Sequence, residues 1–307
     1  MITVLHPPPF ATVQDLGRPG YLHAAVARSG ALDPFALALA NILVGNDPGA
    51  AAIEWGLAGG ELRIERDTTV ALTGAKARAT LGERAVASDR AVRTVAGDVL
   101  RITLIEEGAW LYLAIAGGID VPPVLGSRAT YLPARFGGLE GRLLRAGDRL
   151  PTGEPGSRVP PTDGRGMDGA ASWGAQPIAV LPGPDRHLLP AAAWSWLTQT
   201  EFRVSHAVSR MGYRLEGSQP PFSFPGDLPS APACIGTIQL PPGGEPIVLL
   251  PDGPSVGGYA RVAVVATADI GRLVQRRPGE AIRFHAIGLE EARTRLRDQW
   301  AAHGRQG

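Results

Sequence analysis

Residues 14–33 form a segment rich in glycine, proline and charge, and this segment carries the first side chains that could contact a ligand. The candidates are Asp15, Arg18, Arg28, Ser29 and Asp33. A carboxylate can transfer protons, and an arginine can hold a carboxylate or phosphate through two parallel hydrogen bonds. The glycines and prolines exclude a regular helix or a central strand, so we expect these side chains on a rigid loop. The alternative is a loop that only ties down the N-terminus, and residue chemistry alone does not choose between the two.

Three glycine-rich turns in the second half present further polar groups. Arg210 lies in the first turn, Gln239 in the second, and Gly257-Gly258 in the third. A glutamine side chain offers both a donor and an acceptor, so it could bind an amide or a lactam. Paired glycines allow a ligand to approach the backbone closely. The alternative is that Arg210 and the nearby Arg214 make surface salt bridges and that the glycines only turn corners.

Several common catalytic motifs are absent from the sequence. The only lysine, Lys76, is followed by alanine, so it belongs to no Gly-x-x-x-x-Gly-Lys-Ser/Thr phosphate loop, and it has no flanking methionines as a biotin-carrying lysine would. The 6 histidines lack metal-ligand spacing, and Ser29 is not in a Gly-x-Ser-x-Gly turn. We therefore expect no metal site and no biotin attached to this chain.

Length and composition favour a soluble protein of two domains. The chain has 307 residues, more than one hydrophobic core usually supports. Its formal net charge of +1 gives no electrostatic reason to expect nucleic acid or an anionic membrane as a partner. Cys234 is the only cysteine, which excludes an intrachain disulfide. No signal peptide is visible and no apolar run reaches the roughly 20 residues of a membrane span, so we expect a cytoplasmic location.

The elements that must position the polar segments are one helix and many short strands. Asp33 as N-cap, Pro34 at the first helical position and Gly45 just past the end predict a helix over residues 34–44, anchored by an apolar stripe. The frequent glycines and prolines elsewhere favour strands joined by tight turns. Residues 156–175 have the composition of a linker or long loop, which divides the chain into domains of residues 1–155 and 176–307.

Long motifs at both ends of the chain resemble the KipA family. The first run is Gln14-Asp15-Leu16-Gly17-Arg18-Pro19-Gly20, followed by Ser29-Gly30-Ala31-Leu32-Asp33 and Asn41-Ile42-Leu43-Val44-Gly45-Asn46; the later runs surround Arg210, Gln239 and Gly257. The family is also called allophanate hydrolase subunit 2, the C-subunit of 5-oxoprolinase, or the A-half of a biotin-dependent carboxyltransferase domain. The resemblance implies a mainly β chain of two linked cyclophilin-like β-barrels with a few short helices.

The resemblance also implies a set of site residues, taken over position by position. The predicted catalytic residues are Asp15, Asp33 and Arg210. The predicted substrate-binding residues are Gln14, Arg18, Ser29, Asn41, Tyr213, Gln239, Asp252, Gly257, Gly258 and Tyr259. We expect both halves to line one cleft that a second polypeptide completes.

Three functions are compatible with this resemblance. The first is the C-subunit of an ATP-dependent 5-oxoprolinase, which opens 5-oxoproline to glutamate together with a KipI-like protein and a LamB/YcsF-like protein; ATP is used at the level of the complex. Gln14 or Gln239 would hold the lactam, an arginine its carboxylate, and Asp15 or Asp33 would move protons. The second function transfers a carboxyl group from biotin on another protein to urea or a related amide. The third is a non-catalytic partner of a kinase inhibitor.

One segment departs from the family pattern. Relatives have Asp-Arg-Gln-Thr-Thr before Gly-Gly-Tyr, whereas this chain has Asp252-Gly253-Pro254-Ser255-Val256. An arginine, an amide and a hydroxyl are lost and a stiff proline is gained. The substitutions fall on one predicted substrate loop, so they bear most directly on substrate identity.

Overall fold

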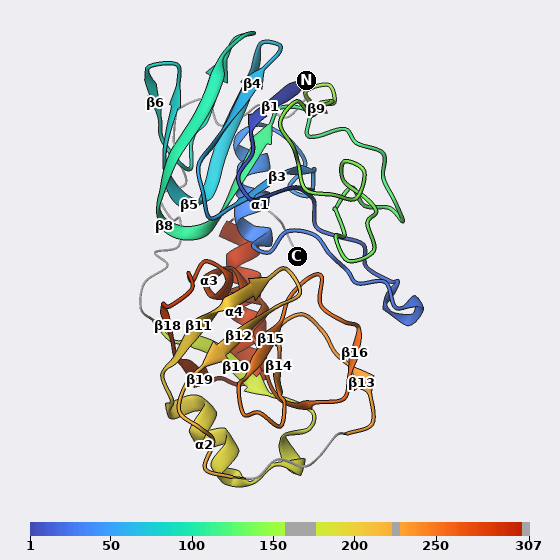
Figure 1. Ribbon diagram of the computed structural model, residues 1–307, viewed down its shortest axis with the longest axis vertical. Coiled ribbons are helices and arrows are strands. Elements are labelled where there is room, and N and C mark those ends of the chain that lie inside the picture. The colour runs from blue at the N-terminus through green and yellow to red at the C-terminus, as the bar shows by residue number, and fades with distance from the viewer. Residues whose placement is uncertain (157–175, 223–227, 303–307) are drawn as a thin grey trace. The chain divides into compact units, whose positions relative to one another are not determined.

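The computed structural model describes residues 1–156, 176–222 and 228–302 (Figure 1). It is 38% strand and 17% helix, so the predicted mainly β class is confirmed. Contacts divide the chain into two compact units, Met1–Arg18 with Ser29–Ser172, and Pro19–Arg28 with Trp173–Gly307. All but the first residue of the predicted linker, 156–175, lies outside the described residues.

The first unit is built on a nine-stranded antiparallel sheet. Its main path runs β2-β3-β8-β4-β1-β9, and β5 extends it by pairing with β6, β7 and β8. The strands are β1 (Ile2–His6), β2 (Phe10–Gln14), β3 (Ala52–Gly56), β4 (Gly60–Ile64), β5 (Thr68–Leu81), β6 (Arg84–Val86), β7 (Ala91–Thr94), β8 (Val99–Ile115) and β9 (Arg149–Leu150). Apolar side chains from most of these strands, among them Trp55, Leu72 and Leu113, form one buried core.

The helix predicted over residues 34–44 is observed as α1 (Pro34–Leu43). Asp33 caps it by accepting a hydrogen bond from the Ala36 backbone N–H at 3.1 Å. The helix packs against β5 and β8 and is buried on nearly every face, not only along the predicted stripe. Its high content of Ala and Leu allows this, since no charged residue occurs within it.

The second unit is an eight-stranded sheet that almost closes on itself. The path runs β18-β11-β12-β15-β14-β17-β10-β19. The strands are β10 (Ile178–Pro182), β11 (Phe202–Ser209), β12 (Gly212–Glu216), β14 (Thr237–Leu240), β15 (Ile247–Leu249), β17 (Ala260–Val265), β18 (Ala281–Ile282) and β19 (Phe284–Ala286), with β13 (Ala231–Pro232) and β16 (Val256–Gly257) forming a separate pair. A single residue, Arg283, joins the two end strands, so the ends of the path must meet. The two units together comprise one nearly closed barrel and a half-barrel.

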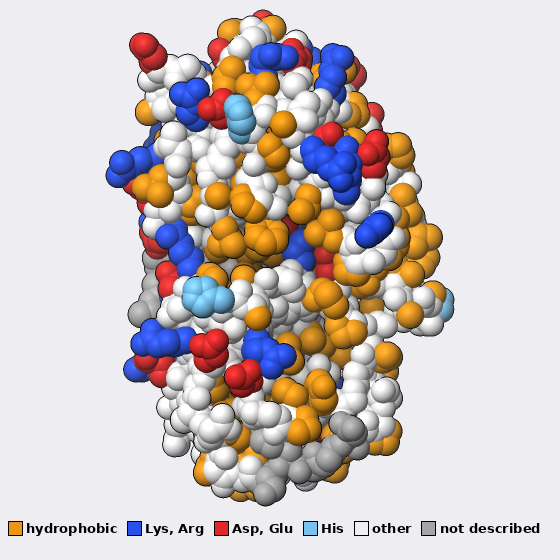
Figure 2. All heavy atoms as spheres, viewed as in Figure 1, with side chains coloured by type: hydrophobic (Ala, Val, Ile, Leu, Met, Phe, Trp, Pro, Cys, Tyr) orange, Lys and Arg blue, Asp and Glu red, His pale blue; other side chains and the backbone are white. Residues whose placement is uncertain are grey.

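Short helices complete the second unit. They are α2 (Ala191–Gln199), α3 (Ile270–Val274) and α4 (Leu289–Ala302), with 3₁₀ turns η2 (Arg186–Leu188) and η3 (Thr267–Asp269); η1 (Leu22–Ala24) lies in residues 19–28. Ala292 of α4 packs against a small buried cluster of Ala179, Ala266 and Ile287. None of the helices within the described ranges has the length and apolarity needed to cross a membrane. Acidic and basic side chains are interspersed over the face drawn in Figure 2, in keeping with the near-zero net charge.

Candidate functional site

Asp15 follows the last residue of β2 and is nearly buried, at 9% exposure. Its Oδ1 accepts hydrogen bonds from the Gly17 N–H and the Ser127 hydroxyl, both at 2.7 Å, and its Oδ2 accepts one from the Arg128 N–H at 2.6 Å. A carboxylate held by two backbone amides and a hydroxyl is already well satisfied. In this structure Asp15 therefore fastens its own loop to residues 127–128.

Gln14 lies at the end of β2 with no exposed surface. Its Nε2 donates to the Thr12 hydroxyl at 3.0 Å and to the Thr130 carbonyl oxygen at 3.1 Å. If the Oε1 and Nε2 atoms of Gln14 were exchanged, two acceptor oxygens would face each other, so the Nε2 donor must face the Thr130 carbonyl oxygen. The Oε1 atom is buried and has no hydrogen-bond partner among the described residues.

Arg18 is buried at 1% exposure and contacts the same region of the chain. One of its terminal nitrogens donates to the Ala129 carbonyl oxygen, and its guanidinium carbon lies 4.8 Å from the centre of the Phe136 ring. A planar guanidinium over an aromatic face gains a cation–π attraction. A Cβ atom at Gly137 would lie 2.9 Å from the same guanidinium, so only glycine fits there without displacing it.

Ser29 and Gly30 lie in a loop segment that packs against the same region. Ser29 has φ of 54° and its hydroxyl donates to the Thr130 carbonyl oxygen at 2.8 Å. Gly30 has φ of 90°, and a Cβ there would lie 2.6 Å from the Gly17 backbone nitrogen. Gln14, Asp15, Arg18 and Ser29 are therefore brought together by shared contacts with residues 127–130.

Asp33 belongs to a second buried network in the first unit. Its backbone N–H donates to the Tyr112 hydroxyl at 2.7 Å, and that hydroxyl donates to Glu54 Oε2 at 2.9 Å. The Leu32 N–H donates to the same carboxylate oxygen at 2.8 Å. Burial, reinforced by the nearby carboxylate of Glu54, raises the pKa of Tyr112 well above its usual value, so the hydroxyl stays protonated and remains a donor.

Asn41 holds the C-terminal end of α1. Its Nδ2 donates to the carbonyl oxygens of Leu37 at 3.2 Å and Ala50 at 2.8 Å. Its Oδ1 accepts from Asn46 Nδ2 at 2.9 Å. Asp33 and Asn41 therefore lie at opposite ends of the same helix, and both stabilise its termini.

In the second unit, Arg210 and Asp252 form a buried ion pair. Arg210 Nε donates to Asp252 Oδ2 at 2.9 Å and a terminal nitrogen donates to Oδ1 at 3.2 Å, with the side chains 5% and 1% exposed. The Asp252 N–H also donates to the Arg210 carbonyl oxygen at 3.0 Å. The contacts between Arg210 and Asp252 fix the start of the 252–258 loop to the turn between β11 and β12. Tyr213, on β12, is also buried, and its hydroxyl donates to the Val274 carbonyl oxygen at 2.9 Å.

Gln239 lies on β14 beneath the turn that carries Gly257 and Gly258. It is 4% exposed, and its Nε2 is buried with no hydrogen-bond partner in the described part of the chain. A Cβ at Gly257 would lie 2.5 Å from that nitrogen, so the backbone can approach it only because residue 257 is glycine. Tyr259, next to this turn, is 41% exposed. Gly257, Gly258 and Tyr259 thus form one surface turn, and the Gln239 amide lies below it with a donor that has no hydrogen-bond partner among the described residues.

The altered loop that precedes this turn is ordered by backbone contacts. Its last residue, Val256, lies in β16 opposite Pro232 of β13, and the Ser255 carbonyl oxygen accepts from the Ala233 N–H at 2.9 Å. A Cβ at Gly253 would lie 2.7 Å from the Met211 carbonyl oxygen. Residues 253–256 therefore pack closely against β13 and against the backbone at Met211.

Each unit thus has its own cluster of predicted site residues. The catalytic and substrate-binding roles stay predictions, as does the hypothesis of one cleft lined by both halves. Over residues 1–156, 176–222 and 228–302, no group of three or more His, Cys, Asp or Glu side chains could hold a metal ion.

Glu54 and Tyr112 were not among the residues predicted from the sequence. Glu54 interrupts the apolar run from Ala50 to Trp55 and has only 1% of its surface exposed. A charged residue within a buried strand requires a specific partner, and that requirement was the available signal. The partner could not be identified from sequence because Tyr112 lies 58 positions away.

Comparison with known proteins places the chain in a family. Residues 24–286 match the model described as carboxyltransferase domain, subdomain A and B. The chain is 40% identical over 299 residues to the C-subunit of 5-oxoprolinase from Escherichia coli (strain K12), covering 97% of this chain and 95% of the relative. It is 31% identical to the urea amidolyase of Lachancea kluyveri, covering 97% of this chain but 18% of that protein. The crystal structure of Kluyveromyces lactis urea carboxylase superposes with a TM-score of 0.92 at 30% identity, covering 98% of this chain and 29% of that one.

Proposed function

Because the chain belongs to the family of carboxyltransferase domains, subdomains A and B, we propose that it is the C-subunit of an ATP-dependent 5-oxoprolinase. The observation that carries this proposal is the match along nearly the full length of a relative that is named as the C-subunit of 5-oxoprolinase. The urea amidolyase and urea carboxylase relatives are several times longer than this chain. The proposed partners are a KipI-like protein and a LamB/YcsF-like protein, and ATP is consumed by the assembled complex.

The proposed reaction adds water across the lactam C–N bond of 5-oxoproline and yields glutamate. The amide is stabilised by resonance, so coupling to ATP hydrolysis makes the opening favourable. Negative charge develops on the carbonyl oxygen when the carbonyl carbon is attacked. A positioned N–H donor lowers the energy of that state, and removing one such donor typically slows turnover by about 100- to 1,000-fold.

We assign this donor role to Gln239. A buried amide N–H without a partner is energetically costly, and the Nε2 atom of Gln239 is in that condition among the described residues. Gly257 and Gly258 give the overlying turn the conformational freedom to move aside for a ligand oxygen. Bond formation with the lactam oxygen would then satisfy the nitrogen.

The contacts of the other predicted residues favour positioning roles. The fork of Arg210 is engaged by Asp252, and the three hydrogen bonds of Asp15 go to its own loop and to residues 127–128. Asp33 caps α1. We therefore propose that these residues hold the loops in place, while Gln239 contacts the substrate.

The test is ATP hydrolysis by the complex reconstituted from this chain and its two proposed partners, with and without 5-oxoproline. We expect Gln239→Leu to lower the 5-oxoproline-dependent kcat about 100-fold while the complex still assembles. Gln199→Leu is the matched control, because Gln199 is exposed at the end of α2 and should leave turnover unchanged. If the wild-type complex shows no 5-oxoproline-dependent ATP hydrolysis, the proposed function is wrong; if Gln239→Leu retains full turnover, only the residue assignment fails.

A second candidate is carboxyl transfer from biotin on another protein to urea or a related amide. The close superposition on urea carboxylase is the specific observation in its favour. Transfer of carboxyl label from a carboxylated biotin carrier to urea by the same complex would support this alternative. The absence of both activities, with stable binding to the KipI-like protein, would leave the non-catalytic partner role.

A further inference from the structure

Gln239 lies under a short two-stranded ribbon formed by β13 and β16, which we call the covering ribbon. Ala231 pairs with Gly257, and Pro232 pairs with Val256. Proline has no backbone N–H to donate, and Pro232 and Val256 are both exposed, so pairing and burial contribute little to the stability of this ribbon. A further contact is therefore needed to keep Gly257 over the amide nitrogen of Gln239.

Arg261 supplies such a contact from the strand next to Gln239. The two residues pair across β14 and β17, so their side chains lie on the same face of the sheet. One terminal nitrogen of Arg261 donates to the Pro232 carbonyl oxygen at 2.5 Å. Arg261 therefore holds the covering ribbon by β13, and β16 carries Gly257 above Gln239.

Asp185 fixes the position of the Arg261 guanidinium. Its Oδ2 accepts from Nε at 2.7 Å and its Oδ1 accepts from one terminal nitrogen at 2.9 Å, which leaves the other terminal nitrogen for Pro232. The Asp185 and Arg261 side chains are 14% and 15% exposed. The hydrogen bonds from Arg261 lower the pKa of Asp185, so its carboxylate is charged at neutral pH. The Asp185 N–H also donates to the Arg261 carbonyl oxygen at 3.3 Å, which fastens the carboxylate to β17.

We propose that Arg261 and Asp185 are a positioning pair that holds the covering ribbon in one place above Gln239. With β13 held, only the glycine turn has to move for a ligand oxygen to reach Gln239, and the oxygen meets the amide donor in a single arrangement. Without the pair, the whole ribbon opens and water competes for the donor. The effect on turnover rests on the proposed function, because it acts through the contact assigned to Gln239, whereas the hold on the ribbon does not.

Hydrogen exchange in the full chain measures the hold on the ribbon without any activity. The Ala233 N–H donates to the Ser255 carbonyl oxygen at 2.9 Å, so its exchange reports separation of the two strands. We expect Arg261→Met to speed exchange at Ala233 at least about tenfold relative to Val265, through loss of the hydrogen bond from a charged group. The Val265 N–H is a suitable reference because it donates to a carbonyl oxygen beside β14 at 2.8 Å.

Asp185→Asn is a milder second variant. It leaves no carboxylate without its cation, so it should fold even if Arg261→Met does not. The asparagine can still accept hydrogen bonds from Arg261, but it no longer binds the guanidinium through two oxygens. We expect exchange at Ala233 to increase about threefold relative to Val265, the size of effect expected for one weakened hydrogen bond.

Turnover by the reconstituted complex tests whether the pair acts through Gln239. We expect Arg261→Met to lower the 5-oxoproline-dependent kcat about tenfold and to change KM less than about twofold, because the lost interaction matters in the transition state. In a Gln239→Leu background the same substitution should cause no further fall, since the donor that it positions is gone. A merely structural role would lower the amount of folded chain equally in both backgrounds.

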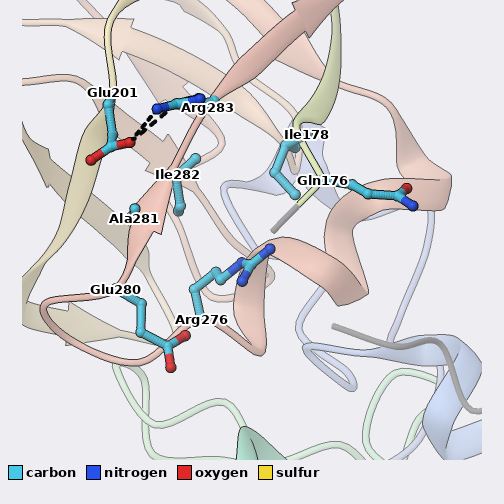
Figure 3. Close-up of a pocket in the computed structure, with 8 residues that line it drawn as sticks. All are labelled: Gln176, Ile178, Glu201, Arg276, Glu280, Ala281, Ile282 and Arg283. Carbon is cyan, nitrogen blue, oxygen red and sulfur yellow. Dashed lines mark hydrogen bonds and ion pairs between the residues drawn. The ribbon is translucent and has the colours of Figure 1, made fainter. Parts of the chain in front are cut away.

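Arg283→Met is the matched control for both measurements. Its guanidinium is also held by one carboxylate, donating to Glu201 Oε2 from Nε at 3.1 Å and from a terminal nitrogen at 2.8 Å (Figure 3). The Arg283 and Glu201 side chains are 63% and 39% exposed, and they line a cavity whose lining residues all come from outside the covering ribbon. Exchange at Ala233 and turnover should therefore be those of the wild type.

Two results would overturn the proposal. One is unchanged exchange at Ala233 relative to Val265 in both Arg261→Met and Asp185→Asn, which would show that the pair does not hold the ribbon. The other is a further fall in kcat of about tenfold when Arg261→Met is added to Gln239→Leu, which would show that the pair does not act through the donor. A wild-type complex without 5-oxoproline-dependent ATP hydrolysis would instead refute the proposed function, and the exchange rates would still decide whether the pair holds the ribbon.

Discussion

Replacing Asp15 by Asn separates a structural role from a catalytic one with the smallest possible change. The substitution keeps the shape of the side chain but removes its charge and converts one acceptor into an NH₂ donor. The wild-type carboxylate accepts from two backbone amides, those of Gly17 and Arg128, on different oxygens. Either orientation of the Asn amide therefore sets its NH₂ group against one of these backbone N–H groups.

The expected loss of stability follows from these contacts. A hydrogen bond to a charged group contributes about 1.5–3 kcal/mol, and a buried donor left without an acceptor costs about 1–3 kcal/mol. Part of the loss is recovered by local relaxation, so we expect Asp15→Asn to lower the free energy of unfolding by about 3 kcal/mol. If Asp15 only holds the loop, the fraction that remains folded should still turn over. A general acid or base would instead contribute about 100- to 10,000-fold to the rate.

Urea unfolding and hydrogen exchange at the Gly17 and Arg128 amides measure the loss in the first unit. Asp120→Asn is the matched control. Asp120 Oδ1 accepts a hydrogen bond from the Arg128 guanidinium at 2.7 Å, but the Asp120 side chain is 54% exposed. Its loss should stay within about 0.5 kcal/mol. Wild-type stability for Asp15→Asn combined with a large fall in kcat of the complex would refute the structural assignment and restore the catalytic one.

Two further predictions concern buried charges. Burial raises the pKa of Asp89 to about 6 from an ordinary 3.8. Its contribution to stability is therefore full below about pH 4 and is lost as the pH rises through 6. We expect Asp89→Asn to stabilise the protein by about 1 kcal/mol at pH 8 and to have little effect at pH 4. The shift would correspond to about 3 kcal/mol for a fully buried group, but water reaches this side chain and reduces the effect. Equal effects in urea unfolding at both pH values would contradict this prediction. Arg210→Ala should lower the free energy of unfolding by about 3–5 kcal/mol, because it leaves the Asp252 carboxylate buried without its cation. The double variant Arg210→Met with Asp252→Leu should recover most of that loss. A double variant as unstable as the single one would show that the pair does more than balance charge.

The anchored helix and the β class could be predicted because they depend on local signals. The Asp33 cap, the Pro34 start and the apolar run fix α1 to within one residue of its predicted end. The closure of the second sheet could not be predicted in this way. It depends on β10 pairing in parallel with β19, more than 100 positions away, and no local pattern specifies such a pairing.

The sequence indicated which first-unit residues share a polar loop, but not the direction in which their side chains point. Asp15, Arg18 and Ser29 occur in a loop whose composition is equally suited to holding a ligand or another part of the chain. The choice depends on distant partners: Ser127 is 112 positions from Asp15, and Thr130 is 101 positions from Ser29. In the structure their polar atoms contact those residues, and their roles toward a ligand stay predictions.

Gln239 differs for a physical reason from the charged residues that were predicted to belong to the site. Asp15, Arg210 and Asp252 carry charge, and a buried charge needs compensating partners in the folded chain itself. An amide is neutral, so one of its atoms can remain unsatisfied at a smaller cost and be available to a ligand. The uncharged residue beneath Gly257 is therefore better suited to the proposed contact with substrate than the charged residues, and each charged residue is better suited to hold its own loop in place.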